Sequence, residues 1–453
     1  MNKRFILVAS ALVLTSACAT QSTELELQSL TDTPETWVMA EGESESVLTG
    51  WLEAMDDPKL RTLVDEALAA NSEINAAQGR LNRARAILSQ SNAAQGPSLS
   101  AEGRASVSEG FGGSADTSSY TAALNASWEA DLWGRLSSAS AADARTADAA
   151  EADFKATQQL IAASTAQAYF QLIEANQLAN VEQTNLESLE ETLGFVSIQF
   201  ERGLRSSEDI ALIRADVETS RASLDLAHQA RRDATRAIEI LIGRYPSASL
   251  QVGSKTPERP AVSVIGLPGD LLTRRPDLRS AKLTLLGQYA RTQTARADLL
   301  PRLSAQASFD GTNSALEDLF DPSALAASLL INGSQALFDG GARRARIKAA
   351  EADADIALAN YQLLLLAAYN EVETELDRGR VLERREVFLS TALSEAEDAL
   401  QFSRFRYELG ESDLLNVLSI QQRVASLEAE LARAQRARLD QYVSLALALG
   451  REI

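Results

Sequence analysis

The two halves of the chain repeat one another, and this duplication constrains every other prediction about the fold. Short motifs recur in the same order at an offset of about 205 residues. The pairs are "PSLSAEG" (97–103) with "PRLSAQA" (301–307), "DLWGR" (131–135) with "LFDGG" (337–341), "FERG" (200–203) with "YELG" (407–410), and "LIG" (241–243) with "ALG" (448–450). Order and spacing that hold over this length indicate one structural unit written twice. The predicted units are a first repeat (51–243), a linker rich in Pro, Gly and Ser (244–267), a second repeat (268–450) and a tail (451–453).

Each repeat is predicted to contain an amphipathic helix, two strands, a very long helix, a glycine turn and a returning helix. The amphipathic helices are expected at about 57–95 and 268–298. The stretch 135–200 contains no proline and few glycines, and as one helix it would measure about 100 Å. Apolar residues near its end follow a 3-4-3-4 spacing: Leu186, Leu189, Leu193, Val196 and Phe200. This spacing and length favour long antiparallel coiled-coil helices over an ordinary globular hairpin.

The stretch "SYTAALNASWEADLWG" (119–134) alternates apolar and polar residues without a break. Side chains of a strand change face at every residue, so one face is apolar and the other mostly polar. The large side chains on the apolar face are Tyr120, Leu124, Trp128 and Leu132. Similar alternation begins near Leu99 and again after Pro301. A fourth segment, about 325–338, leaves its register open because Leu330 falls with Ser328 and Asn332.

Four strands of this kind allow two interpretations. Their length matches membrane strands of about 9–11 residues, although half-buried strands of a soluble sheet alternate in the same way. Four strands cannot close a membrane barrel, since the smallest natural ones have about eight, and an open sheet would leave unpaired backbone groups in lipid. If the strands lie in a membrane, copies of the chain must associate, two giving eight strands and three giving twelve.

The N-terminus predicts export and a lipid anchor. Lys3 and Arg4 precede an apolar run and then small residues, which is the pattern of a signal peptide over 1–17. Cys18 is the chain's only cysteine and follows "TSA", which resembles the lipobox of bacterial lipoproteins. We therefore expect a covalent lipid, with acyl chains such as palmitate, on Cys18 and an N-terminal extension over 18–50. Elsewhere no apolar run approaches the roughly 20 residues of a membrane helix.

Composition argues against several function classes. The formal net charge of −20 disfavours nucleic acid, which binds basic surfaces. The single histidine, His228, and the single cysteine make a soft-metal site improbable, so no metal and no further cofactor are expected. No phosphate-binding loop or catalytic constellation is present, so we expect that the chain is not an enzyme and that a partner supplies energy.

Six motifs together resemble the outer-membrane factor family, the TolC-like channels of tripartite efflux and secretion systems. They are "WLEAMDDPKLRTLVDEALAANSEINAAQGRLNRARA" (51–86), "WEADLWGR" (128–135), "GLPGDLLTRRPDLRSAK" (266–282), "LLPRLSAQASF" (299–309), "ALFDGGARRARIKAA" (336–350) and "RYELGESDLLNVLSIQQ" (406–422). The lipobox with "GLPGDLLTRRPDL" resembles the lipoprotein branch that serves efflux pumps.

The resemblance implies a fold that is mainly α with β. Long helices would form an α-barrel across the periplasm, and four strands per chain would complete a twelve-stranded transmembrane barrel in a homotrimer. It implies an outer-membrane channel, a passive duct that meets a periplasmic adaptor protein and an inner-membrane transporter. The face of Tyr120, Leu124, Trp128 and Leu132 would then contact outer-membrane lipid. The alternative is a periplasmic, lipid-anchored coiled-coil scaffold without a channel. Drugs, metal ions and secreted peptides all remain open as cargo.

The resemblance also places a closed mouth at the turns between the long helices. Gly203 and Gly410 would mark the two tips, and the candidate adaptor contacts are Gly203, Leu204, Arg205, Gly410 and Ser412. The candidate aperture residues are Asp209, Tyr407, Glu411 and Asp413, of which Asp209 and Tyr407 match family residues. Asn416 and Ser419 stand where relatives often carry aspartates, and Ser412 where some carry an arginine. Glu411 and Asp413 either replace the missing acidic ring or are ordinary helix-start carboxylates. Arg202, Arg205 and Arg404 are the nearby arginines that could compensate.

Overall fold

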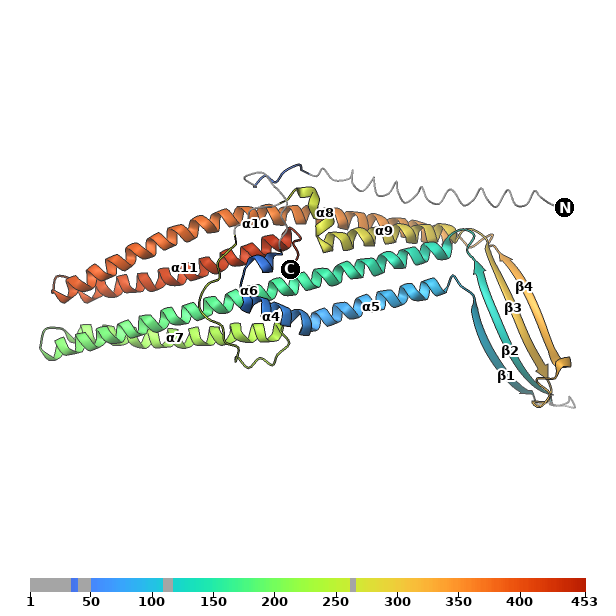
Figure 1. The fold of residues 1–453 in the computed structure, drawn as a ribbon, viewed down its shortest axis with the longest axis horizontal. Coiled ribbons are helices and arrows are strands. Elements are labelled where there is room, and N and C mark those ends of the chain that lie inside the picture. Colours follow the sequence, from blue (N-terminus) through green and yellow to red (C-terminus); the bar gives the residue numbers. More distant parts are fainter. Residues whose placement is uncertain (1–33, 40–49, 109–116, 261–265) are drawn as a thin grey trace.

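The computed structural model describes residues 34–39, 50–108, 117–260 and 266–453. The expected signal peptide and Cys18 lie outside these residues. Figure 1 shows an elongated molecule, in which a rod of long helices carries a β-sheet at one end, bent away from the rod axis. The two helix turns lie together at the opposite end of the rod.

The helices of the two repeats correspond one to one. Those of the first repeat are α3 (Trp51–Ala54), α4 (Pro58–Ala70), α5 (Ser72–Ala93), α6 (Arg135–Glu201) and α7 (Ser207–Leu241). Those of the second are η1 (Pro268–Asp270), α8 (Leu271–Arg274), α9 (Pro276–Ala297), α10 (Ala342–Glu408) and α11 (Leu414–Ala448). Helices α6 and α10 each have 67 residues, α7 and α11 each have 35, and α5 and α9 each have 22. These equal lengths confirm the duplication read from the motifs.

The prediction of one unbroken amphipathic helix per repeat is wrong. The first helix breaks at Asn71, whose backbone is extended and whose side chain caps α5 through the Glu73 N–H at 2.8 Å. The second breaks at Arg275, because the following Pro276 forces the preceding residue out of the helical region. The helical spacing of apolar residues continues across both corners, so this spacing alone predicts one helix where the structure has two.

Both corners hold the end of a returning helix in the same way. The Asn71 amide donates to the Leu241 carbonyl at 2.9 Å, and the Arg275 guanidinium donates to the Ala448 carbonyl at 3.2 Å. Arg275 is buried and also pairs with Asp277 and Glu371, each at 2.7 Å. The "RRPDL" motif therefore ties the α8–α9 corner to α10 and α11.

A short N-terminal segment, residues 34–39, lies against the rod, and we call it the strap. Trp37 is buried in the apolar cluster between α8, α9, α10 and α11. The Glu373 carboxylate accepts the Val38 and Met39 N–H groups at 2.8 and 2.9 Å, and Arg380 donates to the Met39 carbonyl at 2.7 Å. These contacts fix the strap on one side of α10.

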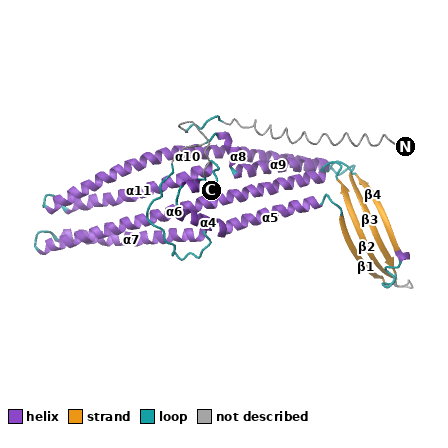
Figure 2. Ribbon diagram, viewed as in Figure 1, coloured by secondary structure: helices purple, strands orange, loops and turns teal. Residues whose placement is uncertain are grey.

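Four antiparallel strands form one sheet in the order β1-β2-β3-β4, drawn in orange in Figure 2. They are β1 (Ser98–Ser108), β2 (Thr117–Ala130), β3 (Arg302–Asn313) and β4 (Leu325–Ser334). The join between the two repeats is the β2–β3 pair, in which Leu124 lies opposite Phe309. Within the described residues the outer edges of β1 and β4 pair with nothing, so the sheet of a single chain is open at both sides.

The structure fixes the register of the fourth strand. Residues directly opposite one another in an antiparallel pair share a face. Ile331 lies opposite Ala305, and Leu330 lies opposite Gln306. Leu330 is therefore an apolar residue on the polar face. Strand β4 ends at Ser334, so the end expected near residue 338 was placed too far along the chain.

Candidate functional site

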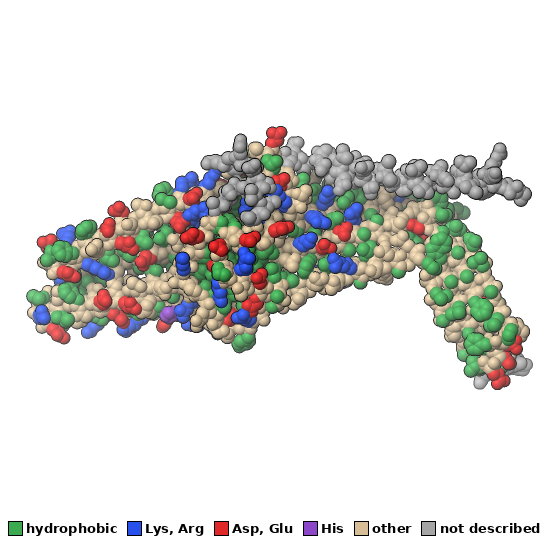
Figure 3. Space-filling model, viewed as in Figure 1, with side chains coloured by type: hydrophobic (Ala, Val, Ile, Leu, Met, Phe, Trp, Pro, Cys, Tyr) green, Lys and Arg blue, Asp and Glu red, His purple; other side chains and the backbone are tan. Residues whose placement is uncertain are grey.

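One face of the sheet is apolar across all four strands. Leu124 is flanked by Ala101 on β1 and by Phe309 on β3. Leu124 is 47% exposed and Trp128 45% exposed, although both lie inside a folded sheet. On the face seen in Figure 3, hydrophobic side chains are spread along the arm formed by the sheet, and acidic ones gather at its free end. A contiguous exposed apolar surface of this size needs an apolar partner outside the chain.

Three of the four residues expected to face lipid share one face of the sheet. Tyr120, Leu124 and Trp128 lie on the apolar face of β2, whereas Leu132 lies two residues beyond its end in a turn. Two tryptophan side chains mark this end of the sheet: the indole N–H of Trp128 donates to the Gln95 carbonyl at 3.0 Å, and that of Trp133 to Pro301 at 2.7 Å. Tryptophans with an apolar body and a bonded N–H are typical of membrane interfaces.

The opposite face of the sheet is lined by hydroxyl and amide groups. Hydroxyl pairs bridge neighbouring strands at 2.7–3.1 Å, and they are Ser98–Ser127, Thr121–Thr312 and Ser308–Ser328. The charged side chains Glu102 and Arg104 neutralise each other at 3.0 Å. This face suits contact with water.

None of the helices in the described part of the chain has an apolar stretch of the length that a bilayer crossing needs.

The far end of the rod is formed by the two helix turns. Gly203 and Gly410 have φ values of 72° and 76°, the left-handed conformation that glycine adopts without strain. After each glycine the next N–H reaches back five residues: Leu204 donates to Gln199 and Glu411 to Arg406, both at 2.9 Å. These are Schellman endings, so both tips lie where the glycines predicted them.

Tyr407 is the best-packed residue of the predicted mouth. Its side chain is buried, the Arg205 guanidinium lies 4.4 Å above its ring, and the Phe195 ring packs edge-on at 6.0 Å. Burial raises the pKa of the Tyr407 hydroxyl, and the nearby Arg205 charge opposes that rise. The hydroxyl has no partner among the described residues. Arg205, from the α6–α7 turn, thus supplies a cation that joins one hairpin to the other.

The aspartates of the mouth cap helices. The Asp209 carboxylate accepts from the Ser206 N–H and hydroxyl, both at 3.0 Å, and forms a capping box at the start of α7. Asp413 caps α11 by accepting the Asn416 N–H at 2.8 Å. Glu411 is exposed and lies 4.0 Å from Arg406, a distance at which an exposed pair contributes little. Within one chain Asp209 and Asp413 therefore act at helix starts.

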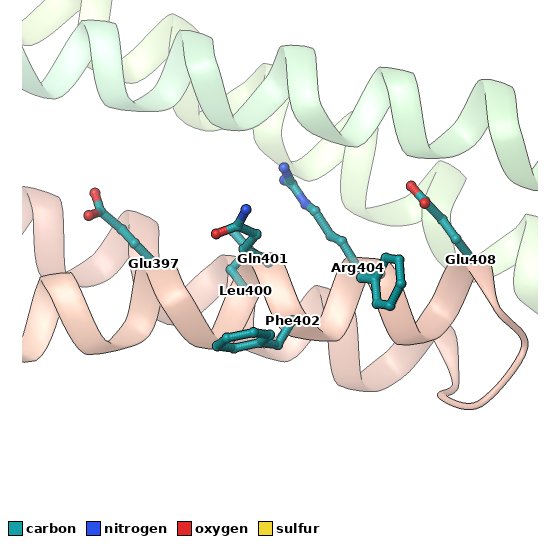
Figure 4. A pocket seen from close by; sticks show the side chains of 7 residues that line it. Glu397, Leu400, Gln401, Phe402, Arg404 and Glu408 are labelled. Atoms are coloured by element: carbon teal, nitrogen blue, oxygen red, sulfur yellow. The ribbon is translucent and has the colours of Figure 1, made fainter.

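Two polar contacts between hairpins were missed by sequence reasoning. Arg404 on α10 donates to the Ser188 hydroxyl on α6 at 2.6 Å, and Gln421 on α11 donates to Asn185 on α6 at 3.1 Å. Figure 4 shows Arg404 reaching from α10 toward the neighbouring hairpin, while Phe402 lies on the other side of the helix. The partners are more than 200 residues apart in the chain, so no local pattern indicates them.

Ser412 and Asn416, which depart from the family pattern, bond within their own hairpin. The Asn416 amide donates to the Ser403 hydroxyl at 2.9 Å and to the Ser412 hydroxyl at 3.3 Å. An amide here joins the end of α10 to the start of α11 without adding charge.

A half-buried charge cluster joins α6 to α11 above the tips. Arg436 donates to Glu174 at 3.1 Å and lies 3.0 Å from Asp440. Burial raises the pKa of Asp440 to about 6, against the lowering effect of Arg436. The Asp440 Oδ1 atom is buried without a partner in the described structure. No group of three acidic, histidine or cysteine side chains in the described ranges is arranged to hold a metal ion.

The sequence model of the outer membrane efflux protein family matches residues 63–244 and 267–451. The chain belongs to this family. The match covers nearly all of both repeats, in two segments that leave out residues 245–266.

Individual relatives agree over almost the whole chain. The pyoverdine export outer membrane protein OpmQ of Pseudomonas aeruginosa is 30% identical, covering 99% of this chain and 97% of that protein. The cation efflux system protein CusC of Escherichia coli is 27% identical over 88% of each. Among solved structures, CusC superposes with a TM-score of 0.83 at 25% identity, covering 92% of this chain and 96% of that one. The outer-membrane channel OprN gives 0.83 at 28% identity, covering 93% and 97%.

As a member of the outer membrane efflux protein family, the chain is an outer-membrane channel of a tripartite efflux system. This confirms the channel prediction over the scaffold alternative, because the membrane-length strands of the sheet belong to the shared fold. The relatives are efflux channel proteins rather than enzymes.

Proposed function

We propose that three copies of this chain form a lipid-anchored duct that carries solutes from an inner-membrane transporter and a periplasmic adaptor to the cell exterior. The single observation that carries the proposal is the sheet, which has one apolar face, one hydroxyl-lined face and two unpaired edges. Pairing β4 of one copy with β1 of the next satisfies both edges and turns the apolar face toward lipid.

The expected width of the lumen favours three copies over two. An eight-stranded barrel has an interior that side chains fill, so two copies would give a plug rather than a duct. Three copies give twelve strands and leave space for solute between the hydroxyl-lined faces. The rod of a single chain is open at its sides in the same way as the sheet. Helix α6 packs between α7 and α11, and α10 lies at the edge beside α11.

A lipid on Cys18 is compatible with the position of the strap. Trp37 packs against Tyr369 with ring centroids 6.1 Å apart, and Tyr369 lies 27 residues into α10. That is about 40 Å from the start of α10 beside the sheet. Trp37 lies nineteen positions after Cys18 in the chain. Since an extended chain spans up to about 65 Å over that length, the acyl chains can reach the inner leaflet of the outer membrane.

We further propose that the duct is passive and that the transporter selects the cargo. The relatives' names differ in cargo, including pyoverdine and cations, while the fold is shared. In this proposal the adaptor contacts Gly203, Leu204, Arg205, Gly410 and Ser412 at the tips. The aperture inside them is formed by Tyr407 with Arg205, supported by Asp209, Glu411 and Asp413.

Cross-linking between copies tests the proposal. One cysteine is introduced at Ser100 in β1 and a second is scanned over β4 from Ser328 to Asn332, with each single-cysteine variant as control. Oxidation of outer-membrane fractions should give dimer and trimer bands, and nothing larger, for the double variants alone. Bands that stop at dimer would overturn the trimer. Chains that stay monomeric and outside the outer membrane would overturn the duct itself.

A further inference from the structure

An apolar rim surrounds the point where the sheet meets the helical rod. Its members are large exposed side chains in the connections between strands and helices: Leu132, Trp133, Leu299, Leu300, Leu337 and Phe338. Leu337 and Phe338, just before α10, are 94% and 90% exposed. If the apolar face of the sheet contacts lipid, as proposed above, this rim marks the periplasmic border of the hydrocarbon layer. The inference that follows rests on that proposed function.

Four basic residues follow the rim within the first two turns of α10: Arg343, Arg344, Arg346 and Lys348. Arg343 is used locally, because it donates to the Asp298 carbonyl at 2.9 Å and lies 3.6 Å from Asp339. The side chains of Arg344, Arg346 and Lys348 are exposed. None of these three side chains makes a hydrogen bond or an ion pair within the described ranges.

The first repeat shows that the fold does not require these charges. The equivalent positions on α6, 207 residues earlier, are Ser137, Ala139 and Ala141. At these three positions the same helix start is therefore built with neutral side chains. The cations on α10 need an explanation other than the stability of the helix.

The helical period separates the three exposed cations into two sides. Arg344 precedes Arg380 by 36 residues, which is about ten full turns, and Lys348 points within about 40° of that direction. Arg346 points about 160° away. The buried side of α10 stays in line over this length, since Ala354, Tyr361, Leu365 and Val372 all face the neighbouring helices. Arg344 and Lys348 therefore share the side of α10 that holds the strap.

That side is the outside of the duct. In the proposed duct, a chain anchored in lipid through Cys18 has its strap on the outer surface of the rod, so Glu373 and Arg380 face outward. Arg344 and Lys348 face outward with them, and Arg346 faces the lumen.

In the proposed trimer, α5 of the next copy supplies no carboxylate to these cations near the sheet. In the half of the rod next to the sheet, the helices pack in the order α5, α6, α9, α10. In the proposed trimer the free side of α10 therefore meets α5 of the next copy. Helix α5 carries Arg80, Arg83 and Arg85, and its single carboxylate, Glu73, lies at the end away from the sheet. An anion that pairs with Arg344 and Lys348 in the proposed trimer therefore comes from outside the protein.

We propose that Arg344 and Lys348, together with the Leu337–Phe338 rim, form a binding site for an acidic phospholipid of the inner leaflet of the outer membrane. Arg344 and Lys348 lie about 3 and 9 Å below the start of α10, within or next to a headgroup layer of about 5–7 Å. Their flexible stems can lift the charges toward a phosphate while the rim contacts the acyl chains. A zwitterionic headgroup carries its own cation and satisfies the pair less well.

Native mass spectrometry of the purified trimer, titrated with phosphatidylglycerol or phosphatidylcholine, tests this site. We expect Arg344→Gln with Lys348→Gln to weaken phosphatidylglycerol binding, by about five-fold for each charge removed. Arg346→Gln is the control for each single glutamine variant, because it removes one positive charge from the same two turns of α10, on the lumen side. Its lipid binding should equal that of the unchanged trimer.

The second test uses a variant that should gain a lipid-binding site. Ser137→Arg with Ala141→Lys rebuilds the pair on α6, and each chain should then bind one additional phosphatidylglycerol. The inference is overturned if the double glutamine variant binds lipid normally, if Arg346→Gln weakens binding equally, or if phosphatidylcholine binds as well as phosphatidylglycerol. The trimer mass appears in the same spectrum, so a failure of assembly is recognised separately from a failure of lipid binding.

Discussion

An arginine at position 124 tests directly whether the apolar face of the sheet meets lipid. Leu124 lies at the centre of β2, between Ala101 and Phe309 on the adjoining strands. Its directly opposite neighbours offer no carboxylate. At the midplane of a bilayer an arginine on the lipid face costs about 2–4 kcal/mol per chain, and less toward the interfaces. We expect Leu124→Arg to lower the free energy of unfolding by that amount.

The neighbouring residue provides the control. Asn125 is one position along the same strand and lies on the hydroxyl-lined face between Ser100 and Ser308. There an arginine remains in water, so Asn125→Arg should change stability by less than about 0.5 kcal/mol. Both variants are unfolded with urea from phosphatidylcholine vesicles, with the fluorescence of Trp128 and Trp133 at the end of the sheet as the signal. Equal costs at the two positions would refute the assignment of the faces.

Three further outcomes are expected. Cys18→Ala should abolish incorporation of labelled fatty acid, and labelling that persists in this variant would refute the anchor. Arg205→Gln should raise single-channel conductance in planar bilayers, whereas Tyr407→Phe should not. The reason is that the Arg205 cation contacts the Tyr407 ring, while the Tyr407 hydroxyl has no partner in the described structure. A higher conductance of Tyr407→Phe alone would assign closure to that hydroxyl. The raised pKa of Asp440, about 6 against 3.8, means that the folded chain holds a proton that the unfolded chain releases, so stability should fall as pH rises from 4 through 6. Asp440→Asn should flatten that dependence and, in chemical unfolding at pH 7.5, raise the free energy of unfolding by at most about 2–3 kcal/mol. An unchanged pH profile would show that Asp440 does not titrate in this range.

The sequence by itself determined the parts of this protein that follow from local periodicity. The spacing of apolar residues and the missing prolines predicted the helix over 135–200, which the structure shows as Arg135–Glu201. Strict alternation gave the two faces of β2, and the repeated glycines gave the tips at Gly203 and Gly410. Each of these features depends on residues within a few positions of one another, so a one-dimensional pattern contains them.

Tertiary structure decided what depends on residues far apart in the chain. The register of β4 follows from its pairing with β3, since its own alternation is broken at Leu330. The contacts of Arg205 with Tyr407 and of Arg404 with Ser188 join hairpins about 200 residues apart, and only the packing of α6 between α7 and α11 brings them together. A local pattern records which side of an element is apolar, but it does not record which other element covers that side.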